Sequence, residues 1–145
     1  MIDGVDRGRI FVYGTLREDP DHDLYRVLAR SSTFVGDATV NGRLYNLGTY
    51  PGLVLSDDPG SRVRGEVYEF QPELEAQTLR ILDEYEGCDA NDQTPHEYRR
   101  ELVQLRFPNG ETARAWAYLL NRDPAGLEMI RGGDYLEWRR NVGAA

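Results

Sequence analysis

Glu86 is the residue whose type and position point most directly to chemistry. It ends a stretch, residues 73–86, in which apolar side chains recur at helical spacing, and it follows Leu82 by four residues and Leu79 by seven. Helical residues advance about 100° each, so the Glu86 carboxyl is expected on the same face as the two leucines. Desolvation on an apolar face raises the pKa of a carboxyl group. Glutamates in this condition often act as general acids or bases.

A second interpretation of Glu86 stays open. Gly87 follows it and is expected to end the helix, so the side chain of this last residue could turn into water as the terminus frays. A carboxylate there would lie at the unfavourable end of the helix dipole, however, which argues against a purely structural role. The same spacing predicts that Asp83 and Glu84 lie off the buried face. The apolar arc of this helix is expected to contain Leu74, Thr78, Leu79, Ile81, Leu82 and Tyr85.

The segment 10–17 is the second candidate. It begins as an apolar run of β-forming residues and breaks at Gly14, which predicts a buried strand that ends at a glycine. Backbone N–H groups without ladder partners can point at an anionic or carbonyl oxygen. The segment could therefore be half of a small-molecule site, although a buried first strand followed by an ordinary turn explains the same residues.

Other reactive side chains give weaker signals. Tyr98 and Tyr118 lie on a predicted β-hairpin and could present their hydroxyls to an interior, or simply pack in the core. The spacing of Cys88 and His96 matches no nucleophile arrangement that we can defend. Two scattered histidines and a single cysteine predict no metal site and exclude an intrachain disulfide. The lone glycine of segment 10–17 is not a phosphate or dinucleotide fingerprint, so no cofactor is expected.

Composition narrows the class of protein. The chain has 145 residues, 40% of them apolar, which predicts one domain over residues 1–145 with a real core and a loose N-terminus at residues 1–8. The net charge of −8 argues against a nucleic acid or an anionic membrane as partner. No leader and no run of membrane-spanning length is recognisable, so a cytoplasmic protein is expected. The sequence leaves the oligomeric state open.

The candidate residues must be positioned by a mixture of strands and short helices. Helices are predicted over residues 21–30 and 73–86, with a short terminal helix docked by Tyr135 and Trp138. A tight turn is expected at Asn41-Gly42, and Gly65 suggests a close backbone approach or a bulge. The predicted strands are residues 33–40, 42–47, 53–55 and 63–70. A hairpin is predicted from residues 97–107, which alternate from Leu102 onward, and residues 111–120.

Short motifs in a fixed order resemble the γ-glutamylcyclotransferase-like superfamily. They are Val12-Tyr13-Gly14-Thr15-Leu16, the segment Tyr45 to Gly52 with its Tyr50-Pro51-Gly52, Val63-Arg64-Gly65-Glu66-Val67-Tyr68, Leu82-Asp83-Glu84-Tyr85-Glu86-Gly87, Tyr98-Arg99-Arg100 and Ala117-Tyr118. The similarity runs from about Arg9 to Arg140, and the small bacterial members and the γ-glutamylamine cyclotransferases form the most similar branch. No single motif is decisive, but their order and spacing together are specific.

The resemblance implies an α+β fold, a compact mixed β-barrel with flanking short helices. It implies that Glu86 is the catalytic acid/base. It also implies substrate-binding residues, which are Tyr13, Gly14, Thr15 and Leu16 in the substrate loop, and Tyr98 and Tyr118 near the cavity. Thr15 stands where many members carry serine, so the hydroxyl is kept.

The activity so implied is an intramolecular cyclisation of a small γ-glutamyl substrate. The free α-amine would attack the γ-carbonyl, expel the attached amine and form 5-oxoproline, with one glutamate moving the protons and without metal or cofactor. The leaving amine and the role of the loop from Cys88 to His96 stay undetermined. The alternative is a non-catalytic small-molecule binding module on the same barrel.

Overall fold

The computed structural model describes residues 8–14, 23–48, 50–88 and 94–143. Thr15 and Leu16 of the expected substrate loop lie outside the described residues, as do residues 1–7 of the expected loose N-terminus.

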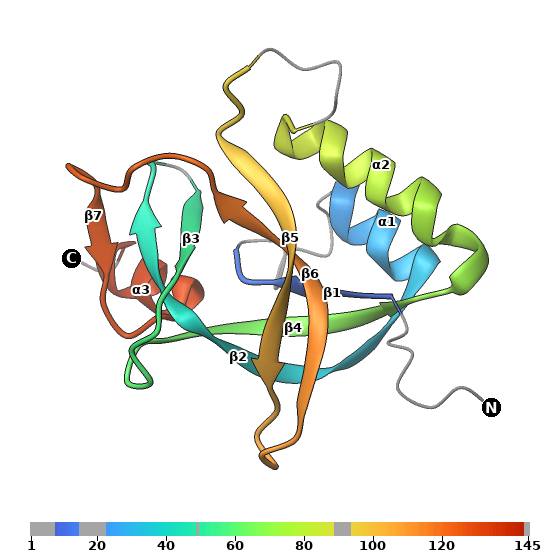
Figure 1. The fold of residues 1–145 in the computed structure, drawn as a ribbon, viewed down its shortest axis with the longest axis horizontal. Coiled ribbons are helices and arrows are strands. Elements are labelled where there is room, and N and C mark those ends of the chain that lie inside the picture. Colours follow the sequence, from blue (N-terminus) through green and yellow to red (C-terminus); the bar gives the residue numbers. More distant parts are fainter. Residues whose placement is uncertain (1–7, 15–22, 49, 89–93, 144–145) are drawn as a thin grey trace.

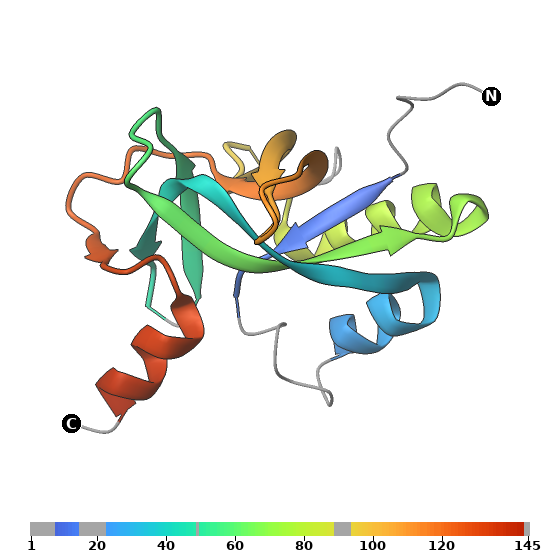
Figure 2. The same cartoon turned by 90° about the horizontal axis from the view of Figure 1, so that it is seen from below.

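Five strands form a closed, mixed barrel (Figures 1 and 2). Neighbours pair antiparallel from β1 to β4, β2 and β3, whereas β6 closes the ring through parallel pairing with β3 and with β1. The barrel strands are β1 (Arg9–Val12), β4 (Arg62–Phe70), β2 (Ser32–Asn46), β3 (Pro51–Leu55) and β6 (Thr112–Leu120). Outside the ring, β5 (Tyr98–Arg106) forms the predicted hairpin with β6, and β7 (Glu128–Ile130), which was not predicted, pairs with β2. The predicted α+β barrel is therefore confirmed.

The tight turn predicted at Asn41-Gly42 is wrong, because β2 continues through both residues. Asn41 pairs with Arg62 of β4, and Gly42 pairs with Leu55 of β3, so the strand changes its partner at this point. A Cβ atom on Gly42 would lie 2.7 Å from the carbonyl oxygen of Val54. The glycine therefore serves a close approach of two strands rather than a reversal of the chain.

Gly65 in β4 makes the close backbone approach that was predicted. A Cβ atom there would lie 2.4 Å from the carbonyl oxygen of Val12 and 2.6 Å from the ring of Phe11. The absence of a side chain lets β1 lie directly against β4.

The helices gather at two ends of the barrel (Figures 1 and 2). At one end, α1 (Asp23–Ser31) packs beside α2 (Glu75–Glu86), which the 3-10 turn η2 (Pro72–Leu74) introduces. At the other end lies α3 (Tyr135–Gly143), whose Tyr135 is buried. Of the described helices, none is long and apolar enough to cross a membrane.

Two apolar clusters hold the molecule together. One fills the barrel and includes Tyr135 and Leu136 of α3. The other lies between the barrel wall and the first two helices, where Leu28 of α1 meets Leu79 and Leu82 of α2. Burial of this apolar surface, rather than helix propensity, is what stabilises helices as short as these.

The buried stripe of α2 is narrower than the predicted arc and is rotated relative to it. Thr78, Leu79 and Leu82 are buried, but Ile81 is 37% exposed and Tyr85 is 59% exposed. Because each residue turns about 100°, a stripe centred on Leu82 and Leu79 leaves Ile81 and Tyr85 on its solvent flank. The opposite flank then turns Asp83 toward the barrel, and the prediction that Asp83 lies off the buried face is wrong.

Candidate active site

Glu86 is the last residue of α2, and its side chain is half-buried. Gly87 adopts the left-handed conformation, with φ of 71°, and its N–H bonds to the carbonyl oxygen of Glu84 at 3.2 Å. The N–H of Cys88 bonds to the carbonyl oxygen of Asp83 at 3.0 Å. These contacts satisfy carbonyls that a helix otherwise leaves free at its end. The last turn is therefore closed, which disfavours the alternative that it frays into water.

Burial raises the pKa of the Glu86 carboxyl from its ordinary value of 4.5 to about 7. The negative charges of Asp83 and Glu97 contribute to this rise, less strongly than burial. A group with a pKa near 7 is present in both protonation states at neutral pH, so it can accept a proton and later return it.

Three tyrosines from separate strands and loops lie within electrostatic reach of Glu86. Burial raises the pKa of Tyr13, and the Glu86 charge raises it further. Burial also raises the pKa of Tyr98, with Tyr13 and Glu86 contributing. The pKa of Tyr50 is raised first by its hydrogen bond to Glu97 and, less strongly, by Glu86. The fold thus brings the end of β1, the start of β5 and the segment before β3 to one carboxyl group.

The hydroxyls of Tyr13 and Tyr98 bond to the protein's own backbone. Tyr13 donates to the carbonyl oxygen of Tyr118 at 2.5 Å and accepts from the N–H of Leu53 at 3.2 Å. Tyr98 donates to the carbonyl oxygen of Pro51 at 2.6 Å. Because both protons are engaged, these side chains tie β1, β3, β5 and β6 together around Glu86.

Gly14 follows Tyr13 directly and is half-buried. A Cβ atom on Gly14 would lie 3.5 Å from the ring of Pro51, which is an ordinary contact. The end of β1 and the start of β3 are therefore neighbours, and both adjoin Tyr98 through its bond to Pro51.

The hydroxyl of Tyr118 is directed at Asp83, to whose Oδ1 it donates at 2.6 Å. The same carboxylate receives two bonds from Arg100, from Nε to Oδ1 at 2.8 Å and from Nη2 to Oδ2 at 3.1 Å. The Arg100 guanidinium also lies 4.3 Å from the centre of the Trp116 ring. Sequence reasoning missed this cluster, because it treated Asp83 as exposed and had no basis for pairing it with Arg100.

Sequence reasoning also missed the contact between Tyr50 and Glu97, at the protein surface. The exposed Tyr50 donates its hydroxyl proton to Oε1 of Glu97 at 2.8 Å, and its ring centre lies 6.1 Å from that of Tyr98. The Tyr-Pro-Gly motif was the only signal that could have pointed to Tyr50, and nothing in the sequence pointed to Glu97.

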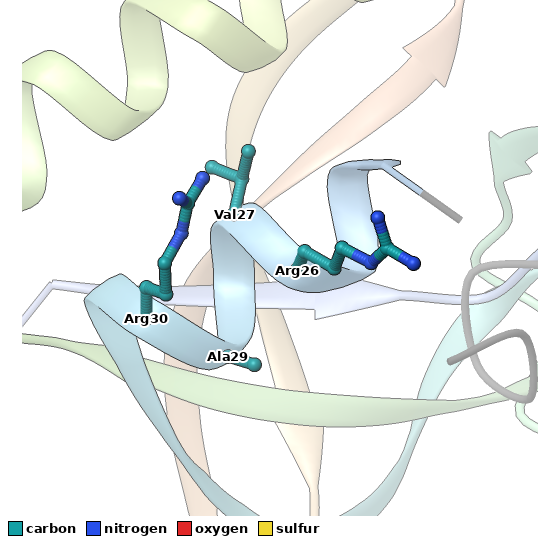
Figure 3. Close-up of a pocket in the computed structure, with 4 residues that line it drawn as sticks. All are labelled: Arg26, Val27, Ala29 and Arg30. Carbon is teal, nitrogen blue, oxygen red and sulfur yellow. The ribbon is translucent and has the colours of Figure 1, made fainter. Parts of the chain in front are cut away.

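A surface hollow elsewhere on the molecule lies along α1. Its described lining residues all come from α1, and the Arg26 and Arg30 side chains extend in different directions (Figure 3). None of its lining residues belongs to the group around Glu86. Within the described ranges, no three His, Cys, Asp or Glu side chains lie together as a metal ion would require.

The described residues therefore form a closed mixed barrel with a half-buried glutamate at the end of a helix that packs on its wall. The family model described as gamma-glutamyl cyclotransferase, AIG2-like, matches residues 10–137. The chain therefore belongs to this family of cyclotransferase enzymes, which act on small γ-glutamyl compounds. The resemblance seen in the sequence is confirmed.

Individual relatives agree with this assignment. The gamma-glutamylcyclotransferase family protein YtfP of Escherichia coli K12 is 37% identical over 131 residues, covering 89% of this chain and 96% of its own. The gamma-glutamylaminecyclotransferase of Rattus norvegicus is 34% identical over 115 residues, covering 72% of this chain and 67% of its own. A crystal structure of an AIG2-like protein from Mus musculus superimposes with a TM-score of 0.63 at 28% identity, covering 82% of this chain and 81% of that one.

Proposed function

We propose that this protein converts a γ-glutamyl amine or γ-glutamyl amino acid into 5-oxoproline and the free amine, with Glu86 as the general acid/base. The observation that carries the proposal is the half-buried Glu86 carboxyl, whose pKa is raised to about 7. The rat relative's name, which specifies γ-glutamylamines, supports an amine as the leaving group.

The reaction needs protons taken from the attacking nitrogen and given to the leaving nitrogen, and Glu86 can act as base and as acid in turn. As carboxylate it takes a proton from the substrate's α-ammonium, and the freed nitrogen attacks the γ-carbonyl carbon and forms a new C–N bond. The protonated Glu86 then gives that proton to the nitrogen of the leaving amine as the original C–N bond breaks. The attacking nitrogen still carries two hydrogens after the new bond forms, and the freed Glu86 carboxylate takes one of them and passes it to the departing amine. The products are the lactam and the protonated amine, and Glu86 returns to the carboxylate. Nucleophile and electrophile share one molecule, so holding it curled supplies much of the acceleration.

The end of β1 is the proposed anchor for the substrate. The carbonyl oxygen gains negative charge during attack, and backbone N–H groups from Gly14 through Thr15 to Leu16 would donate to it or to the α-carboxylate. Tyr13 and Tyr98 would form the wall beside the reacting carbon, since both lie near Glu86. Tyr118 would act indirectly, because its hydroxyl bonds to Asp83. The chemistry as written requires neither metal nor cofactor.

The test is release of 5-oxoproline from a panel of γ-glutamyl amines and γ-glutamyl amino acids. Product from the native protein and a loss of at least about a hundredfold in Glu86→Gln is expected, in line with removal of a general acid/base. Glu84→Gln is the matched control, because Glu84 is an exposed glutamate on the same helix turn and its loss should leave the rate unchanged.

Two results would contradict the proposal. Full activity in Glu86→Gln would rule out the mechanism. If no substrate reacts while γ-glutamyl compounds still raise the melting temperature, the protein is a binding module on the same barrel.

A further inference from the structure

The Asp83 cluster lies one helical turn before Glu86, at the junction of α2 with the β5–β6 hairpin. The Asp83 and Arg100 side chains are only 21% and 23% exposed, and they bond through two parallel N–H to oxygen contacts. Such a two-point pair holds a fixed orientation, which a single contact between flexible side chains does not. Arg100 and Tyr118 are directly paired across the hairpin, so the two residues that bond to Asp83 are held next to each other by the strands.

Both the side chain and the main chain of Asp83 hold the last turn of α2. Its carboxylate joins the helix to β5 through Arg100 and to β6 through Tyr118. Its carbonyl oxygen accepts the N–H of Cys88, in the closing turn that follows Glu86. Asp83 thus holds the backbone before Glu86, through its side chain, and the backbone after Glu86, through the bond from Cys88.

Stability alone does not explain why these groups are charged. Replacing a buried ion pair by well-packed apolar residues is often neutral or stabilising, because the charges lose hydration. Apolar contacts already dock α2 at Leu79 and Leu82. A carboxylate one turn from Glu86 has a further effect that an apolar residue lacks, because its negative charge opposes ionisation of Glu86.

We propose that Asp83, Arg100 and Tyr118 act as a positioning triad, which fixes the last turn of α2 and sets the electric field at the Glu86 carboxyl. The proposal rests on the proposed function of Glu86 for its kinetic consequence. Asp83 supplies the negative charge, Arg100 holds that carboxylate in place and balances its charge, and Tyr118 fixes its orientation. Among the described residues, the other titratable groups whose charges interact with Glu86 stay unchanged in the variants below, and they are Tyr13, Tyr50, Tyr85, Glu97 and Tyr98.

The test uses variants that change charge in opposite directions. Asp83→Asn removes the negative charge and keeps the shape, so the titration of Glu86 should move to lower pH by on the order of one unit. Arg100→Met leaves Asp83 uncompensated, so the titration should move to higher pH. Tyr118→Phe keeps both charges and should lower kcat without a shift, and Arg100→Lys should restore the native titration.

Two readouts separate this proposal from the proposed function. The first is the NMR titration of the Glu86 side-chain carboxyl carbon, identified by its loss in Glu86→Gln, and it needs no substrate. The second is the acidic limb of kcat/KM against pH with the substrate found above. Arg9→Met is the matched control, because Arg9 and Glu69 form a pair of similar exposure, 27% and 24%, and its loss should move neither readout.

Opposite shifts in Asp83→Asn and Arg100→Met support the triad. Shifts in the same direction, or none while both variants lose stability, would show that the cluster is only structural. If the NMR titration shifts as expected but no γ-glutamyl compound reacts, the triad stands and the proposed function fails. If Glu86→Gln is inactive but both charge variants titrate like the native protein, the function stands and the triad fails.

Discussion

Glu86 is a residue whose charge opposes folding. Its pKa is raised from 4.5 to about 7, so between these pH values the folded protein holds a proton that the unfolded chain has already lost. Stability falls with rising pH wherever the folded state binds more protons. The contribution of this carboxyl is therefore favourable below pH 4.5 and is lost as pH rises through about 7.

Glu86→Gln should accordingly stabilise the protein above neutral pH, because glutamine has no charge to desolvate. We expect a gain in the free energy of unfolding of about 2 kcal/mol at pH 8, allowing for partial solvent exposure, and almost none at pH 4. Urea unfolding of the native and variant proteins at both pH values measures this difference. Glu84→Gln, which is exposed, should show no such pH dependence. A gain that does not vary with pH would contradict the burial of the Glu86 charge.

At the residue scale, the sequence predicted where Glu86 lies on its helix but not the contacts that Asp83 makes beside it. Position on a helix face follows from spacing within one element, which is why Glu86 could be placed relative to Leu79 and Leu82. The contact of Asp83 with Arg100 depends instead on how α2 is rotated on the barrel and on the register of β5. The spacing of residues within one element determines neither the rotation of α2 nor the register of β5, so the sequence could not predict this contact.

At the element scale, the end of α2 depends on Gly87. Its φ of 71° lies in the left-handed region, which costs an L-residue roughly 1–2 kcal/mol. Gly87→Ala should lower stability by about 1 kcal/mol and should also reduce kcat/KM, because Glu86 is the preceding residue. Thermal unfolding and 5-oxoproline release measure the two effects.

Gly60→Ala is the control for Gly87→Ala. Gly60 lies in an exposed turn, where a Cβ atom would come no closer than 3.4 Å to Asp58. The Gly60→Ala substitution should therefore change neither stability nor kcat/KM. If Gly87→Ala loses stability but keeps full activity, the closing turn does not position Glu86.

The elements themselves were predicted unevenly. The β5–β6 hairpin was correct because Pro108-Asn109-Gly110 marks its turn and the strands on both sides alternate locally. The middle of the chain failed at Gly42, where β2 passes from β4 to β3 without reversing. A glycine that permits close approach and a glycine that permits a turn look alike in sequence, and only the tertiary partner distinguishes them.

At the scale of the whole molecule, two clusters of buried side chains share one barrel wall. The cluster inside the barrel contains Leu105, whereas the cluster under the first two helices contains Leu82, Tyr98 and Tyr118. Tyr98 and Leu105 lie at opposite ends of β5, about 23 Å apart at 3.3 Å per residue. Truncating a side chain in either cluster should therefore lower the free energy of unfolding by a similar amount. Only a truncation in the cluster under the helices should also lower activity.

Leu82→Ala and Leu105→Ala test this division. Leu82 is 2% exposed and Leu105 is 1% exposed, so each truncation should lower the free energy of unfolding by about 2–5 kcal/mol. Well below either melting temperature, Leu105→Ala should keep the native kcat/KM, because Leu105 belongs to the cluster that fills the barrel and lies far along β5 from Tyr98. Leu82→Ala loosens the face of α2 that carries Glu86, and a loss of tenfold or more is expected, since small displacements of a reacting group are costly. Urea unfolding and steady-state kinetics at one temperature give both quantities. Equal kinetic losses in the two variants would contradict this division. They would mean that the position of Glu86 depends on packing throughout the molecule and not on the packing of α2 alone.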